Sequence, residues 1–146
     1  MRDVKVEAKE RRNLQVVQTF ISAIGSGDTP TAVDKLADDV YWESPVSLSP
    51  PPELVWAKPR HGRQQVLQFI QDMWSVVQPY VMDTLGVVAQ GDRVIIEGRH
   101  QCQVRSTGKF YDHQWVQVFV LKDGLITSQQ QYYDTAPIVE AFRDGN

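Results

Sequence analysis

The sequence has little of several features that mark large classes of protein. Its 146 residues include one cysteine, Cys102, which excludes an internal disulfide framework. Lys and Arg form no sustained run and the formal net charge is −3, which argues against nucleic acid or an anionic membrane as a partner. The opening MRDVKVEAKERR is too charged for the apolar core of a signal peptide, and no apolar run approaches the roughly 20 residues that span a bilayer. We therefore expect a cytoplasmic protein that binds neither nucleic acid nor membrane.

Two further absences limit the cofactor chemistry. The sequence Gly25-Ser26-Gly27 follows a helical pattern rather than a strand, so it is read as a helix stop and not as a phosphate-binding loop. A zinc site built from His100, His113 and an acid would lack the tight ligand spacing that is typical of such sites. We expect no cofactor and no metal.

The apolar periodicity of the first half predicts three helices. Residues 1–12 are charged and lack periodicity, so they are predicted to be a flexible N-terminus, and residues 13–146 to form a single domain. Asn13 is the expected N-cap of the first helix. Apolar residues then recur at helical spacing in this helix, in a shorter one that follows, and in a third helix over residues 62–77.

The second half alternates like strands. Four strands are predicted, over residues 81–89, 93–105, 110–121 and 125–134. The last two are joined by Asp123-Gly124, a strong short-range signal for a hairpin. With a short strand at 40–44, the pattern predicts an α+β fold in which three N-terminal helices pack on a curved, mostly antiparallel sheet.

A loop over residues 45–61 separates the short strand from the third helix. It contains five prolines, which lack a backbone donor and oppose helix formation. Long loops in compact domains often act as lids over functional sites. A lid and a variable surface excursion are both consistent with this composition.

Side-chain alternation indicates which strand faces turn inward. In 93–105 the even positions are apolar and include His100, so this face is predicted to meet the core. In 110–121 we assign the odd positions, from His113 onward, to a ligand pocket, because aromatic side chains interleaved with amides suit one. The face of Val116, Val118 and Val120 is assigned to a homodimer contact, and the reverse assignment stays open.

Four segments carry a resemblance to a known family: FISAIGSGD at 20–28, LADDVYWESP at 36–45, the helix start at Gly62, and VFVLKDGLITSQQQYYDTAP at 118–137. Residues 13–142 resemble the cone-shaped SnoaL-like and ketosteroid-isomerase-like domains, which are also called nuclear transport factor two-like and share a cystatin-like architecture. The resemblance implies that odd residues of 113–121 and 129–133 line the pocket. Such domains host isomerases, polyketide cyclases, epoxide hydrolases and non-enzymatic modules, so the fold alone does not give the function.

The resemblance also shows which catalytic groups are missing. Ketosteroid isomerases place a general-base Asp where this chain has Ser44, and an oxyanion-binding Tyr where it has Phe20. Their protonated Asp falls near Gln117, and the Asp of SnoaL-type cyclases falls at Gln131. The resemblance therefore implies that this chain does not carry the ketosteroid isomerase set.

The candidate chemistry is centred on His100 and His113, which lie on paired strands. Histidine is the usual general acid or base near neutral pH, and Gln131 could hold an oxygen beside the pair. Glu43 or Asp134 would supply an additional acid. The structural alternative is that both histidines are hydrogen-bonded core residues. The residues predicted to bind substrate are Phe20, Trp42, Ser44, Trp74, Trp115, Gln117, Gln129 and Tyr133.

Two functions from different classes follow from this pattern. The first is a cofactor-independent isomerase, cyclase or lyase that acts by proton transfer on an apolar, cyclic, oxygen-bearing small molecule. The second is a non-catalytic ligand-binding or assembly module of the same fold. The absent acids favour the module, whereas the polar and aromatic pocket favours the enzyme.

Overall fold

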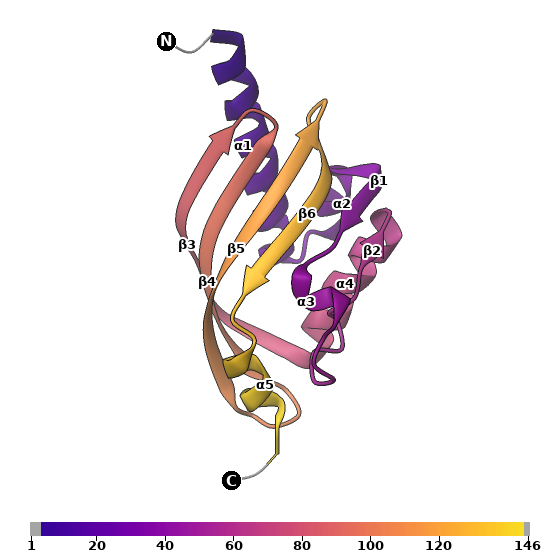
Figure 1. The fold of residues 1–146 in the computed structure, drawn as a ribbon, viewed down its shortest axis with the longest axis vertical. Coiled ribbons are helices and arrows are strands. Elements are labelled where there is room, and N and C mark those ends of the chain that lie inside the picture. Colours follow the sequence, from indigo (N-terminus) through magenta and orange to yellow (C-terminus); the bar gives the residue numbers. More distant parts are fainter. Residues whose placement is uncertain (1–3, 145–146) are drawn as a thin grey trace.

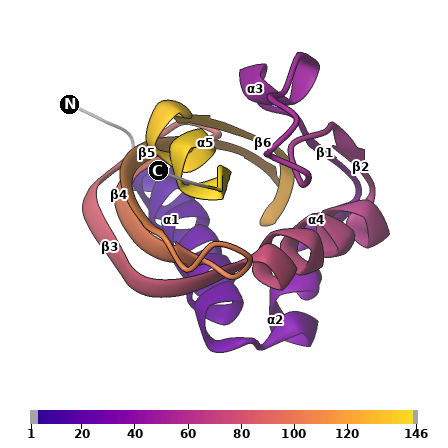
Figure 2. The ribbon, with the colours of Figure 1, turned by 90° about the horizontal axis from the view of Figure 1, so that it is seen from below.

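The computed structural model describes residues 4–144, with side chains from residue 7 onward. A six-stranded sheet curls around the helices, with strand order β2-β1-β6-β5-β4-β3 (Figures 1 and 2). The strands are β1 (Leu36–Trp42), β2 (Arg60–His61), β3 (Val77–Gln90), β4 (Arg93–Val104), β5 (Phe110–Lys122) and β6 (Leu125–Tyr133). The helices are α1 (Val4–Ser26), α2 (Thr29–Asp34), α3 (Pro45–Leu48), α4 (Arg63–Val76) and α5 (Ala136–Phe142). This is the α+β architecture with a curved, mostly antiparallel sheet that the sequence predicts.

Helix α1 begins at Val4, so the predicted N-cap at Asn13 is wrong, whereas the flexibility of residues 1–12 stays a prediction. The reason is a long-range contact that local periodicity cannot show. Asn13 is buried and its Nδ2–H donates to the Gly91 carbonyl at 3.5 Å, while Lys9 pairs with Asp92. The β3–β4 turn thus holds this charged stretch as helix. Residues 1–3 lie outside the described part of the chain.

The β5–β6 hairpin forms where Asp123-Gly124 predicts it. Asp123 has φ 53° and Gly124 has φ 78°, so both central residues take the left-handed conformation of a type I′ turn. Asn, Asp and Gly tolerate this conformation best, and its twist matches that of the flanking strands. The hairpin, together with a register shift between Val120 and Leu121, pairs Gln117 with Gln131 and Trp115 with Tyr133.

The inner face of the sheet is the one that the alternation indicates. In β4 the buried positions are even, and in β5 they are odd. A core of Phe20, Trp42, Phe119 and neighbouring aliphatic residues lies between this face and helix α1. Trp115 lies directly over Gly98, where an added Cβ would stand 2.1 Å from the indole. Gly98 therefore makes room for a ring that forms part of the cavity wall.

Strand β1 pairs in parallel with the last strand, β6, and antiparallel with β2. This places residues 36–42 within the same sheet, between β6 and the short edge strand β2. It also sets the proline-rich loop, which leaves β1 and returns through β2, beside one end of the sheet. Figure 2 shows α4 and the segment around α3 on the side of the molecule opposite β3. None of the helices among residues 4–144 is long and apolar enough to cross a membrane.

Candidate functional site

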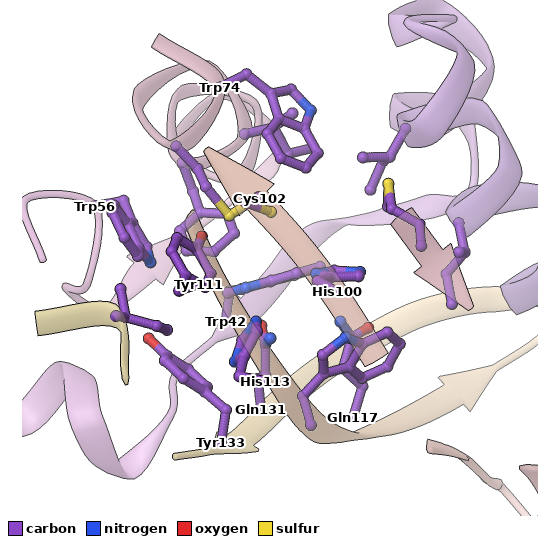
Figure 3. A pocket seen from close by; sticks show the side chains of 18 of the residues that line it. Trp42, Trp56, Trp74, His100, Cys102, Tyr111, His113, Gln117, Gln131 and Tyr133 are labelled. Atoms are coloured by element: carbon purple, nitrogen blue, oxygen red, sulfur yellow. The ribbon is translucent and has the colours of Figure 1, made fainter. Parts of the chain in front are cut away.

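A cavity of about 70 Å³ lies on the concave side of the sheet, between strands β4–β6, helices α1 and α4, and the proline-rich loop. All four tryptophans of the chain contribute to its wall. Figure 3 shows side chains from several of these elements converging on it. The polar and aromatic residues that line it are Phe20, Trp42, Trp56, Phe69, Trp74, His100, Cys102, Tyr111, His113, Trp115, Gln117, Gln131 and Tyr133.

His100 and His113 face each other across the β4–β5 ladder, as the predicted strand pairing requires. They are direct register partners, and their ring centroids are 5.8 Å apart. His100 also lies against the Trp115 indole at 4.9 Å, and His113 against the Tyr133 ring at 5.5 Å. Both line the cavity, so one wall presents two imidazoles to any bound molecule.

Both histidines are neutral at physiological pH. Burial, with a smaller contribution from the neighbouring His113, lowers the pKa of His100 to about 4. Burial lowers the pKa of His113 to about 4 as well, against the opposing attraction of Asp112 and Asp134. A buried imidazole loses the hydration that stabilises its charged form. The pair is therefore fully deprotonated at pH 7 and can accept, but not donate, a first proton.

Two tyrosines border the histidines and stay protonated. Burial raises the pKa of Tyr133 to about 12, and Tyr133 takes a hydrogen bond from Trp56. Burial also raises the pKa of Tyr111, which is hydrogen-bonded to Cys102. Both phenols act as neutral hydrogen-bonding groups in the cavity wall.

The proline-rich loop covers one side of the cavity and contributes Trp56 to it. The buried guanidinium of Arg60 holds the loop, because its Nη2–H donates to the Trp56 carbonyl and to Asp72 Oδ2, each at 3.0 Å. Hydrogen bonds from Gln68 and then from Arg60 lower the pKa of Asp72, which keeps this carboxylate ionised. The Arg60 guanidinium also lies 5.6 Å from the centroid of the Phe69 ring. Loop, helix α4 and cavity wall are thus connected through one residue.

The two acids that the sequence analysis predicts to be catalytic lie outside the cavity. Glu43 turns to the outer side of β1, where the Tyr41 hydroxyl donates to it. Asp134 is exposed and accepts the Ala136 N–H at 3.2 Å, which is the turn-capping role of an Asp that precedes Thr-Ala-Pro. None of the described residues that line the cavity is Asp, Glu, Lys or Arg.

Two predicted substrate-binding residues also lie away from the cavity. Ser44 caps the loop at the start of α3, and its Oγ accepts the backbone N–H of Gln131 at 2.8 Å. Gln129 is completely buried in β6 but does not line the cavity, and neither end of its amide has a partner among the described residues. Ser44 therefore positions β6 rather than a ligand.

The structure brings the remaining predicted residues together: Phe20, Trp42, Trp74, His100, His113, Trp115, Gln117, Gln131 and Tyr133 all line the cavity. Sequence reasoning missed Tyr111, although it shares the inward alternation of His113 and Trp115 and could have been found from it. It also missed Trp56, because no periodicity runs through a proline-rich loop.

Several polar atoms of the cavity residues have no partner. The Nε1–H groups of Trp42 and Trp115 and the Nδ1 atom of His113 are buried and make no hydrogen bond to any described residue. The three side chains are 5%, 5% and 7% exposed. A buried donor left without an acceptor costs about 1–3 kcal/mol, so these atoms favour an occupant that can pair with them. The described residues include no cluster of three or more His, Cys, Asp or Glu that could hold a metal ion.

Comparison with known proteins gives the family and the fold. A family model described as "SnoaL-like domain" matches residues 17–129, most of the chain. The chain belongs to the SnoaL-like family. Among solved structures it is similar to an NTF2-like protein from Burkholderia xenovorans, with 27% identity, a TM-score of 0.79, and coverage of 92% of this chain and 98% of that one.

Two other similar structures, which are less identical in sequence, are described with a ligand or an activity. TerC, co-crystallised with polyporic acid, is 18% identical with a TM-score of 0.76, and the match covers 91% of this chain and 99% of that one. An LEH-like epoxide hydrolase from M. tuberculosis is 19% identical with a TM-score of 0.70, covering 92% and 91%. At these identities the likeness shows a shared fold alone.

Proposed function

We propose that this SnoaL-like protein is a cofactor-independent enzyme that moves a proton on a small, oxygen-bearing organic molecule. The observation that carries the proposal is the cross-strand pair of neutral imidazoles, His100 and His113, on the wall of a cavity that contains no carboxylate among its described lining residues. In a site without Asp or Glu, these imidazoles are the strongest bases available.

The reaction that suits this arrangement is proton removal from a carbon next to a carbonyl. One imidazole takes the proton, the C–H electron pair forms the enolate C=C bond, and the carbonyl π pair moves to oxygen. The resulting imidazolium returns a proton to the same or to a conjugated carbon, which leaves the substrate exchanged or isomerised with no net change of redox state. Gln117 on β5 and Gln131 on β6 are register partners, and their amide groups can bind a second oxygen of the substrate.

The volume of the cavity limits the substrate. A cavity of about 150 Å³ is known to accommodate benzene, and this one, at about 70 Å³, is half that size. The cyclic substrate expected from the sequence therefore enters only if the wall moves. Met73 and Met82 are the wall members best suited to move, since methionine is flexible.

Hydrogen–deuterium exchange tests the proposal directly. In D₂O the protein is expected to accelerate loss of the α-proton NMR signals of acetone and of cyclohexanone, the second probe reporting whether a ring is admitted. His100→Gln and His113→Gln should each lower the rate by about 10²-fold or more. His61→Gln is the matched control, because His61 is exposed on β2 outside the cavity. A wild-type rate no higher than that of buffer would reject the enzyme.

The alternative is a non-catalytic binding module, which the lack of carboxylates in the cavity favours. It predicts saturable binding of small molecules with no exchange in any variant. His100→Gln and His113→Gln would then alter affinity alone. The two functions are separated by whether exchange, rather than binding, depends on the histidines.

We further propose that the outer face of the sheet forms a homodimer contact. It carries exposed apolar side chains, with Tyr80 60% and Phe110 51% exposed, alongside the half-buried Val116, Val118 and Val120. An apolar sheet face opposite the helices normally requires a covering layer. The same face carries the Arg99–Asp112 ion pair, which can fix the orientation of the two copies.

A further inference from the structure

Two indole N–H groups of the cavity lining have no hydrogen-bond acceptor among the described residues. Trp42 Nε1 and Trp115 Nε1 belong to side chains that are 95% buried and that line the same cavity from β1 and β5. An indole N–H can only donate, so no tautomer or side-chain flip converts either group into an acceptor. No described residue supplies that acceptor, so an acceptor group bound in the cavity that both side chains line would satisfy the two donors.

Two other polar groups in the cavity wall already have hydrogen-bond partners, unlike the indoles of Trp42 and Trp115. The Trp56 indole hydrogen-bonds to Tyr133, and Tyr111 hydrogen-bonds to Cys102. The third polar atom without a partner is His113 Nδ1, on the same wall. In one tautomer of the imidazole this nitrogen carries a hydrogen and donates, so an occupant with an acceptor atom would also pair with it.

The lining also determines the charge of the occupant. None of its described members is Asp, Glu, Lys or Arg, so neither a buried anion nor a buried cation would find a counter-charge. The aromatic rings could in principle cage an ammonium ion through their π faces. An N–H donor carries its positive end on the hydrogen and does not favour a cation, and burial lowers the pKa of both histidines, so a positive charge is disfavoured here.

We propose that the cavity selects an uncharged molecule whose carbonyl-type oxygen accepts hydrogen bonds from Trp42 and Trp115. This rests on the function proposed above, which it deepens by naming the recognised group. Because the cavity measures about 70 Å³, the part of the molecule that enters is a compact carbonyl group with its immediate substituents. The two indoles then bind the oxygen on which negative charge develops when a histidine removes the neighbouring proton.

Three probes of the same size and different charge test this proposal. Acetone, acetate and trimethylammonium each have four non-hydrogen atoms and differ in being neutral, negative and positive. The chain has four tryptophans, so a ¹⁵N-labelled sample gives four indole N–H signals, which single Trp→Phe variants assign. Acetone is expected to move the Trp42 and Trp115 protons downfield in a saturable way and to bind about tenfold or more tighter than either ion.

Variants supply an independent measurement. Trp42→Phe and Trp115→Phe keep an aromatic ring but remove the donor, and each should weaken acetone binding by about tenfold. Tyr80→Phe, at an exposed position outside the cavity, should leave it unchanged. If either tryptophan variant fails to fold, the shifts of the two indole protons in the wild-type protein still decide the question.

Three other outcomes would overturn the proposal. Tighter binding of trimethylammonium would identify an aromatic cage for cations, and tighter binding of acetate an anion site. If none of the probes moves the Trp42 and Trp115 signals, the cavity does not recognise a carbonyl. If acetone binds at the indoles without α-proton exchange, this inference is retained and the enzyme is rejected. If exchange occurs but the indole signals do not move, the enzyme is retained and this inference is rejected.

Discussion

Gly98 is the residue on which the shape of the cavity depends most directly. A Cβ at this position would lie 2.1 Å from Cζ2 of Trp115, so Gly98→Ala must displace the indole from the cavity wall. We expect the free energy of unfolding to fall by about 1–3 kcal/mol, the usual cost of overpacking, with a change in tryptophan fluorescence. Urea denaturation measures the first quantity.

Gly25→Ala provides the matched control for that substitution. Gly25 lies in helix α1, and a Cβ there meets nothing within 4 Å. The variant should be neutral or more stable by up to about 1 kcal/mol, because alanine favours helix. Equal stability of the two glycine variants would show that Trp115 does not rest on Gly98 in solution.

The histidine pair makes stability depend on pH. Each folded-state pKa of about 4 lies below the unfolded value near 6.5, so the unfolded chain binds more protons between these limits. The stabilisation is complete above about pH 6.5 and is lost as the pH falls toward 4, by up to about 3 kcal/mol for each histidine. His100→Gln and His113→Gln should flatten the slope of unfolding free energy over this range, measured by urea denaturation at several pH values. His61→Gln should retain it, and an equally steep slope in all three variants would contradict the assignment.

At the scale of elements, the proline-rich loop is held to helix α4 through Arg60. Arg60→Met removes the hydrogen bonds to the Trp56 carbonyl and to Asp72, which should cost about 1.5–3 kcal/mol and free the loop. Amide hydrogen exchange over residues 50–60 should accelerate. Lys58→Met, at an exposed position of the same loop, should leave exchange as in the wild type. Unchanged exchange in Arg60→Met would show that the loop is held by its own packing.

The elements also show what the sequence could reveal. Alternation in β4 and β5 predicted that His100 and His113 face inward, because a buried sheet face imposes a period of two on its side chains. It could not show that Gln129 is buried away from the cavity, or that Ser44 bonds to the β6 backbone, because neither feature leaves a periodic trace. The helical start at Val4 escaped prediction for a similar reason, since its support comes from the distant β3–β4 turn.

At the scale of the whole molecule, the outer sheet face predicts self-association. Val118→Lys places a charge at the centre of that face and should convert a dimer to a monomer, as measured by light scattering after size-exclusion chromatography. Gln64→Lys, exposed on α4, is the control of equal charge and should remain dimeric. A wild-type monomer at all concentrations tested would reject the homodimer.

The parallel pairing of β1 with β6 has a consequence for how the chain acquires its structure during synthesis. β1 is complete by Trp42, yet its neighbour in the sheet ends at Tyr133. During synthesis on the ribosome, β1 therefore has one unpaired edge until about ninety further residues have been translated. Non-local pairings of this kind slow folding, so nascent chains truncated before the last hairpin should remain dependent on chaperones.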